Sequence, residues 1–193
     1  MLEVFQSYIN SKASITDEEF ETIKSLCILK KLRKKQYLLQ EGDVWKYNAF
    51  ICAGCVRAYR IDDKGVEHII QFAIENHWTG DRESLISGEP SHLNIDAIED
   101  TTVLLITKEN FDAIRRAVPA FNEMVETILH KSFVASQNRI HAAISLTAEE
   151  KYQHFITHSP GVANRVPQHM IASYLGISAE TLSRIRNQAA KHK

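Results

Sequence analysis

The sequence has little of what would stabilise a fold covalently or carry the chain through a membrane. It contains only 3 cysteines among 193 residues, an odd number and too few for a disulfide-stabilised scaffold. Its apolar runs are short, as in Val103–Ile106, and none approaches the roughly 20 residues of a transmembrane helix. The N-terminal residues show no basic stretch followed by an apolar core, so no secretory signal is expected. These absences predict a reduced, cytoplasmic protein.

Neither sign of charge dominates the chain, which carries 23 lysines and arginines against 24 aspartates and glutamates. A protein coated evenly with positive charge for nucleic acid is therefore excluded. The balance differs along the sequence, because residues 146–193 hold six bases and three acids, whereas the first 145 residues hold 17 bases and 21 acids. A basic C-terminal segment on an acidic body indicates a local anionic partner. With 44% hydrophobic residues, the chain has enough apolar side chains for a folded core.

Residues 16–106 change from a helical to a β-type pattern. Thr16 and Glu19 form a capping-box sequence, and Phe20 and Ile23 follow at helical spacing. Short β-type runs then alternate with turn sequences, several of which contain glycine. The β-type runs cover residues 37–40, 50–52, 56–61, 68–73, 95–98 and 102–106. Several short strands this close together predict an antiparallel sandwich or barrel rather than βαβ units.

Helical periodicity returns at about Lys108 and continues toward the C-terminus. Residues 120–144 contain neither glycine nor proline and carry a partial apolar stripe, which predicts one helix roughly 37 Å long. A helix of that length exceeds what a domain of this size usually needs for its own packing. Thr147 and Glu150 form a second capping-box sequence, which predicts another helix that ends near Ser159.

Residues 166–186 match a helix-turn-helix position by position. Gly176 is the tight-turn residue, Ile177 fills the gap between the two helices, and Ser178 caps the second helix. The inward-facing residues are Ile171, Ala172, Leu175, Leu182 and Ile185. The residues that point outward from the second helix are Ala179, Glu180, Ser183, Arg184 and Asn187. In this motif the second helix enters the major groove of DNA.

Two outward-pointing groups of the second helix have the chemistry to read bases. The Glu180 carboxylate accepts a hydrogen bond from a cytosine amino group, and the Arg184 guanidinium pairs with guanine O6 and N7. Ala179 and Ser183 lie beside them and complete the predicted base-reading set. Phosphate contacts contribute affinity but not sequence preference. The side chains predicted to make them are Gln168, Thr181, Arg165, Arg186 and Lys191.

The order of these elements resembles the CRP/FNR superfamily of bacterial transcription regulators. The resemblance covers nearly the whole chain, and its closest match is residues 178–184, which read Ser-Ala-Glu-Thr-Leu-Ser-Arg. It implies an α+β fold with an antiparallel β-roll (a double-stranded β-helix, as in cupin-like jelly rolls) and flanking helices over residues 1–118. A long dimerisation helix over 119–145 and a helix-turn-helix DNA-binding domain over 146–193 would follow. Ala179 stands where some members carry arginine, so the half-site is expected to differ there.

The same resemblance implies a homodimer that binds a palindromic operator in double-stranded DNA. The candidate dimer-interface residues on the long helix are Phe121, Val125, Ile128, Ser132 and Ala135. Two such helices packed together would place two recognition helices about one turn of DNA apart. RNA polymerase is a further partner that the family suggests, although no residue of the sequence identifies a surface for it.

No cofactor is expected, and cyclic AMP in particular is not. Cyclic nucleotide-binding members of the superfamily hold the phosphate with an arginine that follows a Gly-Glu-Leu-type element. Residues 78–94 keep a matching Gly80 but place His92 and Leu93 where that arginine would stand, and a buried phosphate needs a fixed cation. The candidate effector pocket consists of Gly80, Asp81, Arg82 and His92, and the identity of its ligand stays open.

Cysteine and metal chemistry find little support in the sequence. Three cysteines cannot supply the four thiolates of an iron–sulfur cluster, and Cys52 and Cys55 bracket a predicted hairpin turn. The spacings of His68, His77 and His92 match no metal site. The leading prediction is therefore a DNA-binding transcription regulator without catalytic residues. The alternatives are a sensor of the same fold whose DNA binding requires a small molecule, and a cupin-like metal enzyme.

Overall fold

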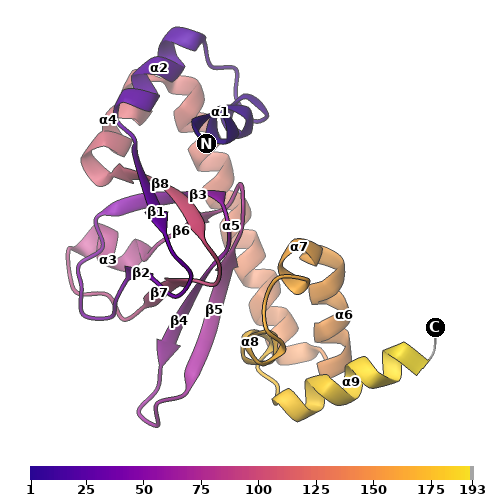
Figure 1. Cartoon of the computed structure of the whole chain (residues 1–193). Helices are drawn as coiled ribbons and strands as arrows, with labels where there is room; N and C mark the ends of the chain where they lie inside the picture. Colours follow the sequence, from indigo (N-terminus) through magenta and orange to yellow (C-terminus); the bar gives the residue numbers. More distant parts are fainter. Residues whose placement is uncertain (192–193) are drawn as a thin grey trace.

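In the computed structural model, a β-rich N-terminal part is joined by one long helix to a group of short helices (Figure 1). The backbone is described for residues 1–191 and the side chains for residues 1–189. No helix in this described part is long and apolar enough to cross a membrane. The predicted α+β class with antiparallel strands is confirmed.

The N-terminal part contains two four-stranded antiparallel sheets. The strands are β1 (Ile28–Leu32), β2 (Tyr37–Leu39), β3 (Tyr47–Ala53), β4 (Val56–Ile61), β5 (Glu67–Ala73), β6 (Trp78–Thr79), β7 (Asn94–Ala97) and β8 (Thr101–Thr107). The order is β1-β8-β3-β6 in the first sheet and β2-β7-β4-β5 in the second. Strand β5 therefore lies at an edge of the second sheet. Its pairing with β4 shifts register between Ala58 and Tyr59, whose partners are Gln71 and Ile69, so that Ile70 is left out of the register as a bulge.

Two apolar cores hold the β-rich part together. The first lies between the sheets and includes Val56, Ile95 and Val103, none of which reaches solvent. The second packs one face of the first sheet against helices and includes Phe5 and Phe50, whose ring centroids are 5.0 Å apart. The helices of this part are α1 (Leu2–Asn10), α2 (Asp17–Ser25), α3 (Arg82–Ser87) and α4 (Lys108–Ala117).

The predicted long helix is confirmed as α5 (Pro119–Ser145), which has 27 residues. It is followed by α6 (Ala148–His158), α7 (Pro160–Ala163), α8 (Gln168–Leu175) and α9 (Ala179–Lys191), and no strand occurs between residues 146 and 191. Both predicted capping boxes are present, at Thr16 with Glu19 and at Thr147 with Glu150. These caps set the starts of α2 and α6 because they satisfy backbone N–H groups that the helix itself leaves unpaired.

Helices α6 to α9, here named the C-terminal helical unit (residues 146–191), pack on the second sheet, beside β5 in Figure 1. A third apolar core joins the two parts. From the sheet it includes Tyr59, Ile69 and Phe72, and from the helical unit it includes Phe155 and Ile171. The helical unit is therefore held against the β-rich part by buried apolar contacts as well as by its covalent connection through α5.

Candidate nucleic-acid interface

Helices α8 and α9 meet in the tight turn that the sequence predicts. Gly176 ends α8 with a φ of 66°, a left-handed conformation that glycine adopts without steric cost. The N–H of Ile177 donates to the carbonyl of Ala172 at 3.0 Å. Ser178 then begins α9, because its hydroxyl oxygen accepts the N–H of Thr181 at 3.1 Å. The predicted turn residue and helix cap are both confirmed.

Four of the five predicted inward-facing residues of α8 and α9 are buried, and the fifth, Leu175, is half-buried against the same core. The exposed fraction is 1% for Ile171, 2% for Ala172, 1% for Leu182 and 5% for Ile185. Because these residues fix which way α9 is turned, the opposite face of α9 is left to solvent. That face carries the residues predicted to read bases.

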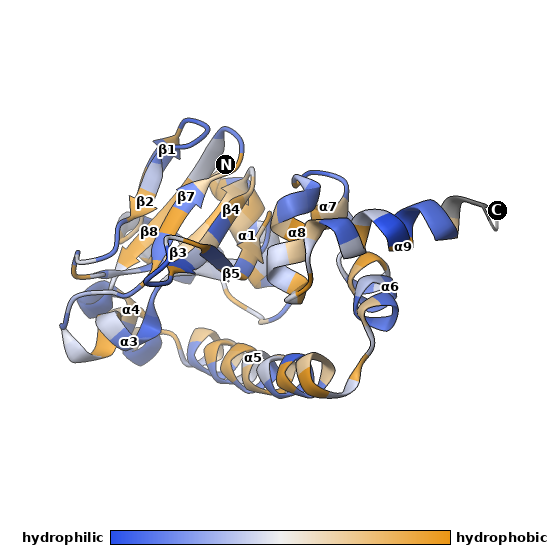
Figure 2. Ribbon diagram, turned by 90° about the horizontal axis from the view of Figure 1, so that it is seen from below, coloured by the Kyte–Doolittle hydropathy of each residue, from blue (hydrophilic) through white to orange (hydrophobic). Residues whose placement is uncertain are grey.

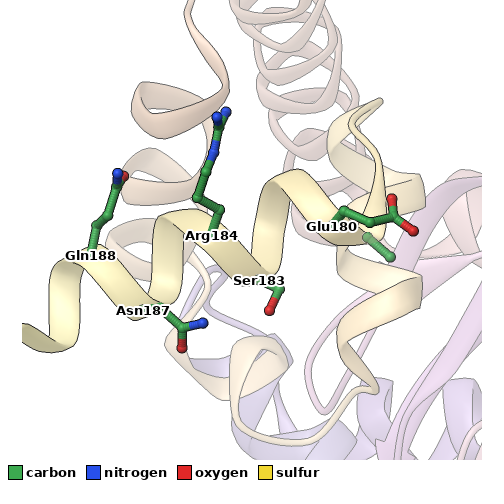
Figure 3. Close-up of a pocket in the computed structure, with 6 residues that line it drawn as sticks. Glu180, Ser183, Arg184, Asn187 and Gln188 are labelled. Atoms are coloured by element: carbon green, nitrogen blue, oxygen red, sulfur yellow. The ribbon is translucent and has the colours of Figure 1, made fainter.

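The exposed face of α9 forms a shallow groove. Its lining residues are Ala179, Glu180, Ser183, Arg184, Asn187 and Gln188. Figure 3 shows Glu180, Arg184 and Gln188 leaving successive turns of the helix. The N–H of Glu180 and the hydroxyl of Ser178 lower the pKa of the Glu180 carboxyl, so this group is ionised and acts only as an acceptor. One anionic acceptor and one cationic donor are thus presented a helical turn apart.

The side chains predicted to contact phosphate differ in their surroundings. Gln168 and Arg186 lie beside the exposed face, in a second shallow groove that Ser183 and Asn187 also line. Thr181 is half-buried at the start of α9, where its hydroxyl accepts a hydrogen bond from Ser178. The side chain of Lys191 lies outside the described residues. Arg165 differs from all of these.

Arg165 is engaged within the chain rather than free for phosphate. Its guanidinium pairs with the carboxylate of Glu75 at 2.7 Å and also with that of Glu99. Both acids belong to turns of the β-rich part, and Glu75 in addition accepts the N–H of Gly54 at 2.7 Å. The prediction of a phosphate contact at Arg165 is wrong for this arrangement, because two carboxylates already neutralise the cation. Arg165 instead ties the C-terminal helical unit to the β-rich part.

The ion pair between Glu75 and Arg165 predicts a specific pH dependence. Partial burial alone would raise the pKa of Glu75, but the Arg165 guanidinium and the Gly54 N–H lower this pKa from 4.5 to about 2. The pKa of Glu75 is therefore lower in the folded state than in the unfolded state. The ionised carboxylate contributes its full share to the free energy of unfolding above about pH 4.5, and this contribution is lost as the pH falls toward 2. We expect the difference in unfolding midpoint between the wild type and Glu75→Gln to stay constant from pH 7 to 5 and to shrink below. A difference that disappears already near pH 6 would contradict this assignment.

One face of α5 packs on the chain's own β-rich part. Phe121 is 0% exposed and Val125 is 6% exposed, both within the core that includes Phe111 and Ile114. Ile128 packs against the same core, and Ser132 lies one helical turn further along this face. The prediction that Phe121 and Val125 contact a second subunit is therefore wrong, because the single chain already covers them. Ile128 is half-buried, and Ser132 and Ala135 are exposed.

Another face of α5 is apolar and uncovered. Phe133, Ile140 and Ile144 are 63%, 57% and 80% exposed. At 3.6 residues per turn these three side chains lie within about 40° of one another around the helix, about 60–100° from Val125 and about 120–160° from Ile128. Figure 2 shows apolar residues along the whole length of α5, including the side that no other element of the chain faces. We name Phe133, Ile140 and Ile144 the α5 stripe. It could not be identified from the sequence, because periodicity alone does not show which face of α5 the β-rich part occupies.

A cavity of about 230 Å³ lies between α5 and the first sheet. Its walls include Trp45, Gln71, Trp78, Arg82 and Ile128. Gly80 also lines it with a φ of 141°, and a Cβ at this position would stand 2.5 Å from the Trp45 indole nitrogen. Two of the predicted pocket residues, Gly80 and Arg82, are thus brought to one cavity, which is largely aromatic and aliphatic.

The other two predicted pocket residues, Asp81 and His92, do not line this cavity. Asp81 is buried and caps α3, where one carboxylate oxygen accepts the N–H groups of Glu83 and Ser84 at 2.9 and 3.2 Å. Its other oxygen accepts the hydroxyl of Ser91 at 2.7 Å. His92 is exposed on the adjacent loop. The placement of both residues in the pocket is wrong, since the Asp81 carboxylate serves the local fold.

The cysteine side chains are buried or half-buried and unreactive. Burial raises the pKa of the Cys27 and Cys55 thiols to about 12, so neither is a thiolate at neutral pH. Among the described residues, no three histidine, cysteine or acidic side chains are grouped so that they could hold a metal ion.

Comparison with known proteins relates the chain to bacterial regulators. A sequence model of the cyclic nucleotide-binding domain matches residues 29–117. The transcriptional activator protein Anr of Pseudomonas protegens is 22% identical over 165 residues, which cover 80% of this chain and 67% of Anr. The regulatory protein HlyX of Actinobacillus pleuropneumoniae is 23% identical over 196 residues, which cover 92% of this chain and 78% of HlyX.

Solved structures show the same fold. FixK2 from Bradyrhizobium japonicum has a TM-score of 0.73 at 21% identity, with 86% of this chain and 85% of that chain covered. The catabolite activator protein of Thermus thermophilus has a TM-score of 0.56 at 19% identity, with 93% of this chain and 85% of that chain covered. The relatives and the fold agree with the helix-turn-helix formed by α8 and α9. The chain is thus similar over most of its length to transcription regulators of the CRP/FNR type, and residues 29–117 match the cyclic nucleotide-binding domain.

Proposed function

We propose that the protein acts as a homodimer on a palindromic site in double-stranded DNA, with α9 of each subunit in the major groove. The observation that carries this proposal is the exposed face of α9. Glu180 and Arg184 stand one turn apart on it, and neither contributes to a core of the chain. The carboxylate suits a cytosine amino group and the guanidinium suits a guanine edge. Ala179 and Ser183 complete the base-reading set, and Gln168, Thr181, Arg186 and Lys191 are assigned to phosphate.

A second copy of this chain is the partner we assign to the α5 stripe. Large exposed apolar side chains in a row on a soluble protein mark an interaction surface. The stripe lies on the half of α5 that leads to the helical unit. A parallel pairing of two α5 helices would therefore set the spacing of the two copies of α9. This seam differs from the one predicted from the sequence, of which Phe121 and Val125 pack on the β-rich part.

The experiment that tests this function is selection from a random duplex DNA pool with purified, nucleotide-free protein at near-physiological salt. We expect an enriched palindrome whose half-sites are about one helical turn apart. Protein carrying both Glu180→Ala and Arg184→Ala is the matched control and should enrich no such sequence. An enriched sequence without two-fold symmetry would contradict binding as a homodimer.

A second candidate is a sensor of the same fold whose DNA binding requires a small molecule. The cavity beneath α5 favours it, because Ile128 and Leu129 of the long helix form part of the cavity wall. Its aromatic walls and the guanidinium of Arg82 fit a mainly apolar ligand with one anionic group. Selection that succeeds only after such compounds are added would establish this candidate.

Cyclic AMP is not the ligand we propose. The Asp81 carboxylate already accepts the N–H groups at the start of α3, and its own charge would repel a phosphate placed there. Calorimetric titration with cyclic AMP should therefore show no binding heat. We propose neither a cofactor nor a catalytic residue. A chromosomal ligand implies action in the cytoplasm, with RNA polymerase as an expected partner whose contact surface is not assigned.

A further inference from the structure

The outer edge of β5 is covered by side chains instead of by another strand. Ser173 of α8 accepts the N–H of Ile69 at 3.1 Å and donates its hydroxyl proton to the carbonyl of Glu67 at 2.8 Å. Arg139 of α5 donates to the carbonyls of Ile70 and, at 3.3 Å, of Ile69. An edge strand offers such unpaired backbone groups to any partner. Here α5 and α8 both use them.

Arg139 contacts the helical unit at the same time. Its guanidinium lies over the ring of Tyr174, 4.2 Å from the ring centroid. Tyr174 in turn packs on Phe72 of β5 and on Phe155 of α6, with ring centroids 5.3 and 5.5 Å apart. A planar guanidinium can bond two carbonyl groups and stack on a ring together, which an ammonium group cannot. One side chain of α5 thereby holds both β5 and α8.

The bulge in β5 makes this contact available. Because Ile70 falls out of the register with β4, its carbonyl stands where Arg139 reaches it. The next residue, Gln71, lines the cavity beneath α5 and donates its amide N–H to the carbonyl of Trp78 at 3.1 Å. Neighbouring residues of one strand thus contact the cavity and Arg139.

We propose that Arg139 is a positioning residue that fixes the C-terminal helical unit relative to α5 and so sets the spacing of the two recognition helices in the dimer. The proposal rests on the proposed function, since α5 carries the dimer stripe and α9 carries the base-reading face. The fixed arrangement leaves that face exposed, so it does not block DNA. It lowers the entropy lost when the second half-site is bound.

The test compares affinity for the full palindrome with affinity for a duplex that carries one half-site. For Arg139→Ala we expect a loss of about 10-fold or more on the full site and a change within about 2-fold on the half-site. Arg139→Lys keeps the charge but not the paired donors or the stacking, so an intermediate loss is expected. Lys131→Ala is the matched control, because it removes a cation from an exposed position on the same helix.

Each outcome decides between specific alternatives. Equal losses on both duplexes would overturn the proposal, because Arg139 would then act through folding or through a direct phosphate contact. An unchanged or increased affinity for the full site would overturn it as well. If the wild type itself binds both duplexes equally, the homodimeric function fails and not merely the role of Arg139. If Arg139→Ala folds poorly, the test uses Arg139→Lys instead. A ratio of full-site affinity to half-site affinity equal to that of the wild type would then overturn the proposal.

Discussion

Replacing Phe133 and Ile140 together with glutamate is expected to convert the proposed homodimer to monomers. Both side chains lie on the α5 stripe and are more than half exposed in the single chain, so the exchange removes no contact of the monomer's core. In a symmetric dimer four apolar side chains would be lost from the seam and like charges placed near one another. At roughly 1.5 kcal/mol for each buried side chain, the dimer dissociation constant should rise by at least about 100-fold.

Sedimentation equilibrium measures this change directly, and DNA affinity reports its consequence. The double variant should bind a half-site duplex as the wild type does but gain little from a second half-site. The matched control is Val134→Glu, which also adds a carboxylate at an exposed apolar position, about 100° around the helix from Phe133. An unchanged dimer in the double variant, or an equal loss in the control, would show that the seam lies elsewhere.

Replacing Arg184 with alanine is expected to weaken binding to the selected palindrome by about 1–3 kcal/mol per half-site, which is about 5- to 150-fold. The physical reason is the loss of two parallel hydrogen bonds to a guanine edge. Binding to a site changed at that one base pair should fall much less, because this site never made the contact. The measurement is a pair of titrations with matched and single-substituted duplexes.

Arg186→Ala provides the comparison for Arg184→Ala. Arg186 lies at the rim of α9, in the groove shared with Gln168, and is assigned to phosphate. Removal of the Arg186 side chain should lower the affinity for both duplexes by the same factor and reduce the dependence of affinity on salt concentration. If Arg184→Ala also lowers the affinity for both duplexes by the same factor, Arg184 contacts phosphate and the base-reading role belongs to its neighbours.

The helix-turn-helix could be predicted because local chemistry determines it. Gly176 is needed for a left-handed turn, Ser178 caps the helix that follows, and the apolar residues repeat at helical spacing. The strands from β2 to β5 were predicted on similar local grounds, by short apolar runs between turn sequences. Helix α1 was not predicted, although Phe5 and Ile9 lie one turn apart and both are fully buried. Its apolar face is only two turns long, which is a weak signal without the sheet that it covers.

Contacts between distant parts of the chain could not be predicted from the sequence. Arg165 resembles any other basic residue near a helix-turn-helix until the turns that carry Glu75 and Glu99 are placed beside it. The direction in which α5 faces depends in the same way on where the β-rich part lies. Periodicity identified α5 as amphipathic, but two faces of this helix are apolar and only one of them is covered. Two of the predicted dimer residues, Phe121 and Val125, were therefore placed on a face that the chain itself covers, while Ser132 and Ala135 are exposed and stay candidates.

The covered edge of β5 also has a consequence for the solubility of the protein. Ser173 and Arg139 occupy backbone groups that would otherwise pair with a strand from another molecule. The helical unit covers Tyr59 and Phe72 on the same sheet. A chain released from the ribosome before the C-terminal helical unit has folded would thus expose a free strand edge beside an apolar surface, the combination from which intermolecular sheets grow. The DNA-binding part of this regulator therefore also protects its β-rich part from aggregation.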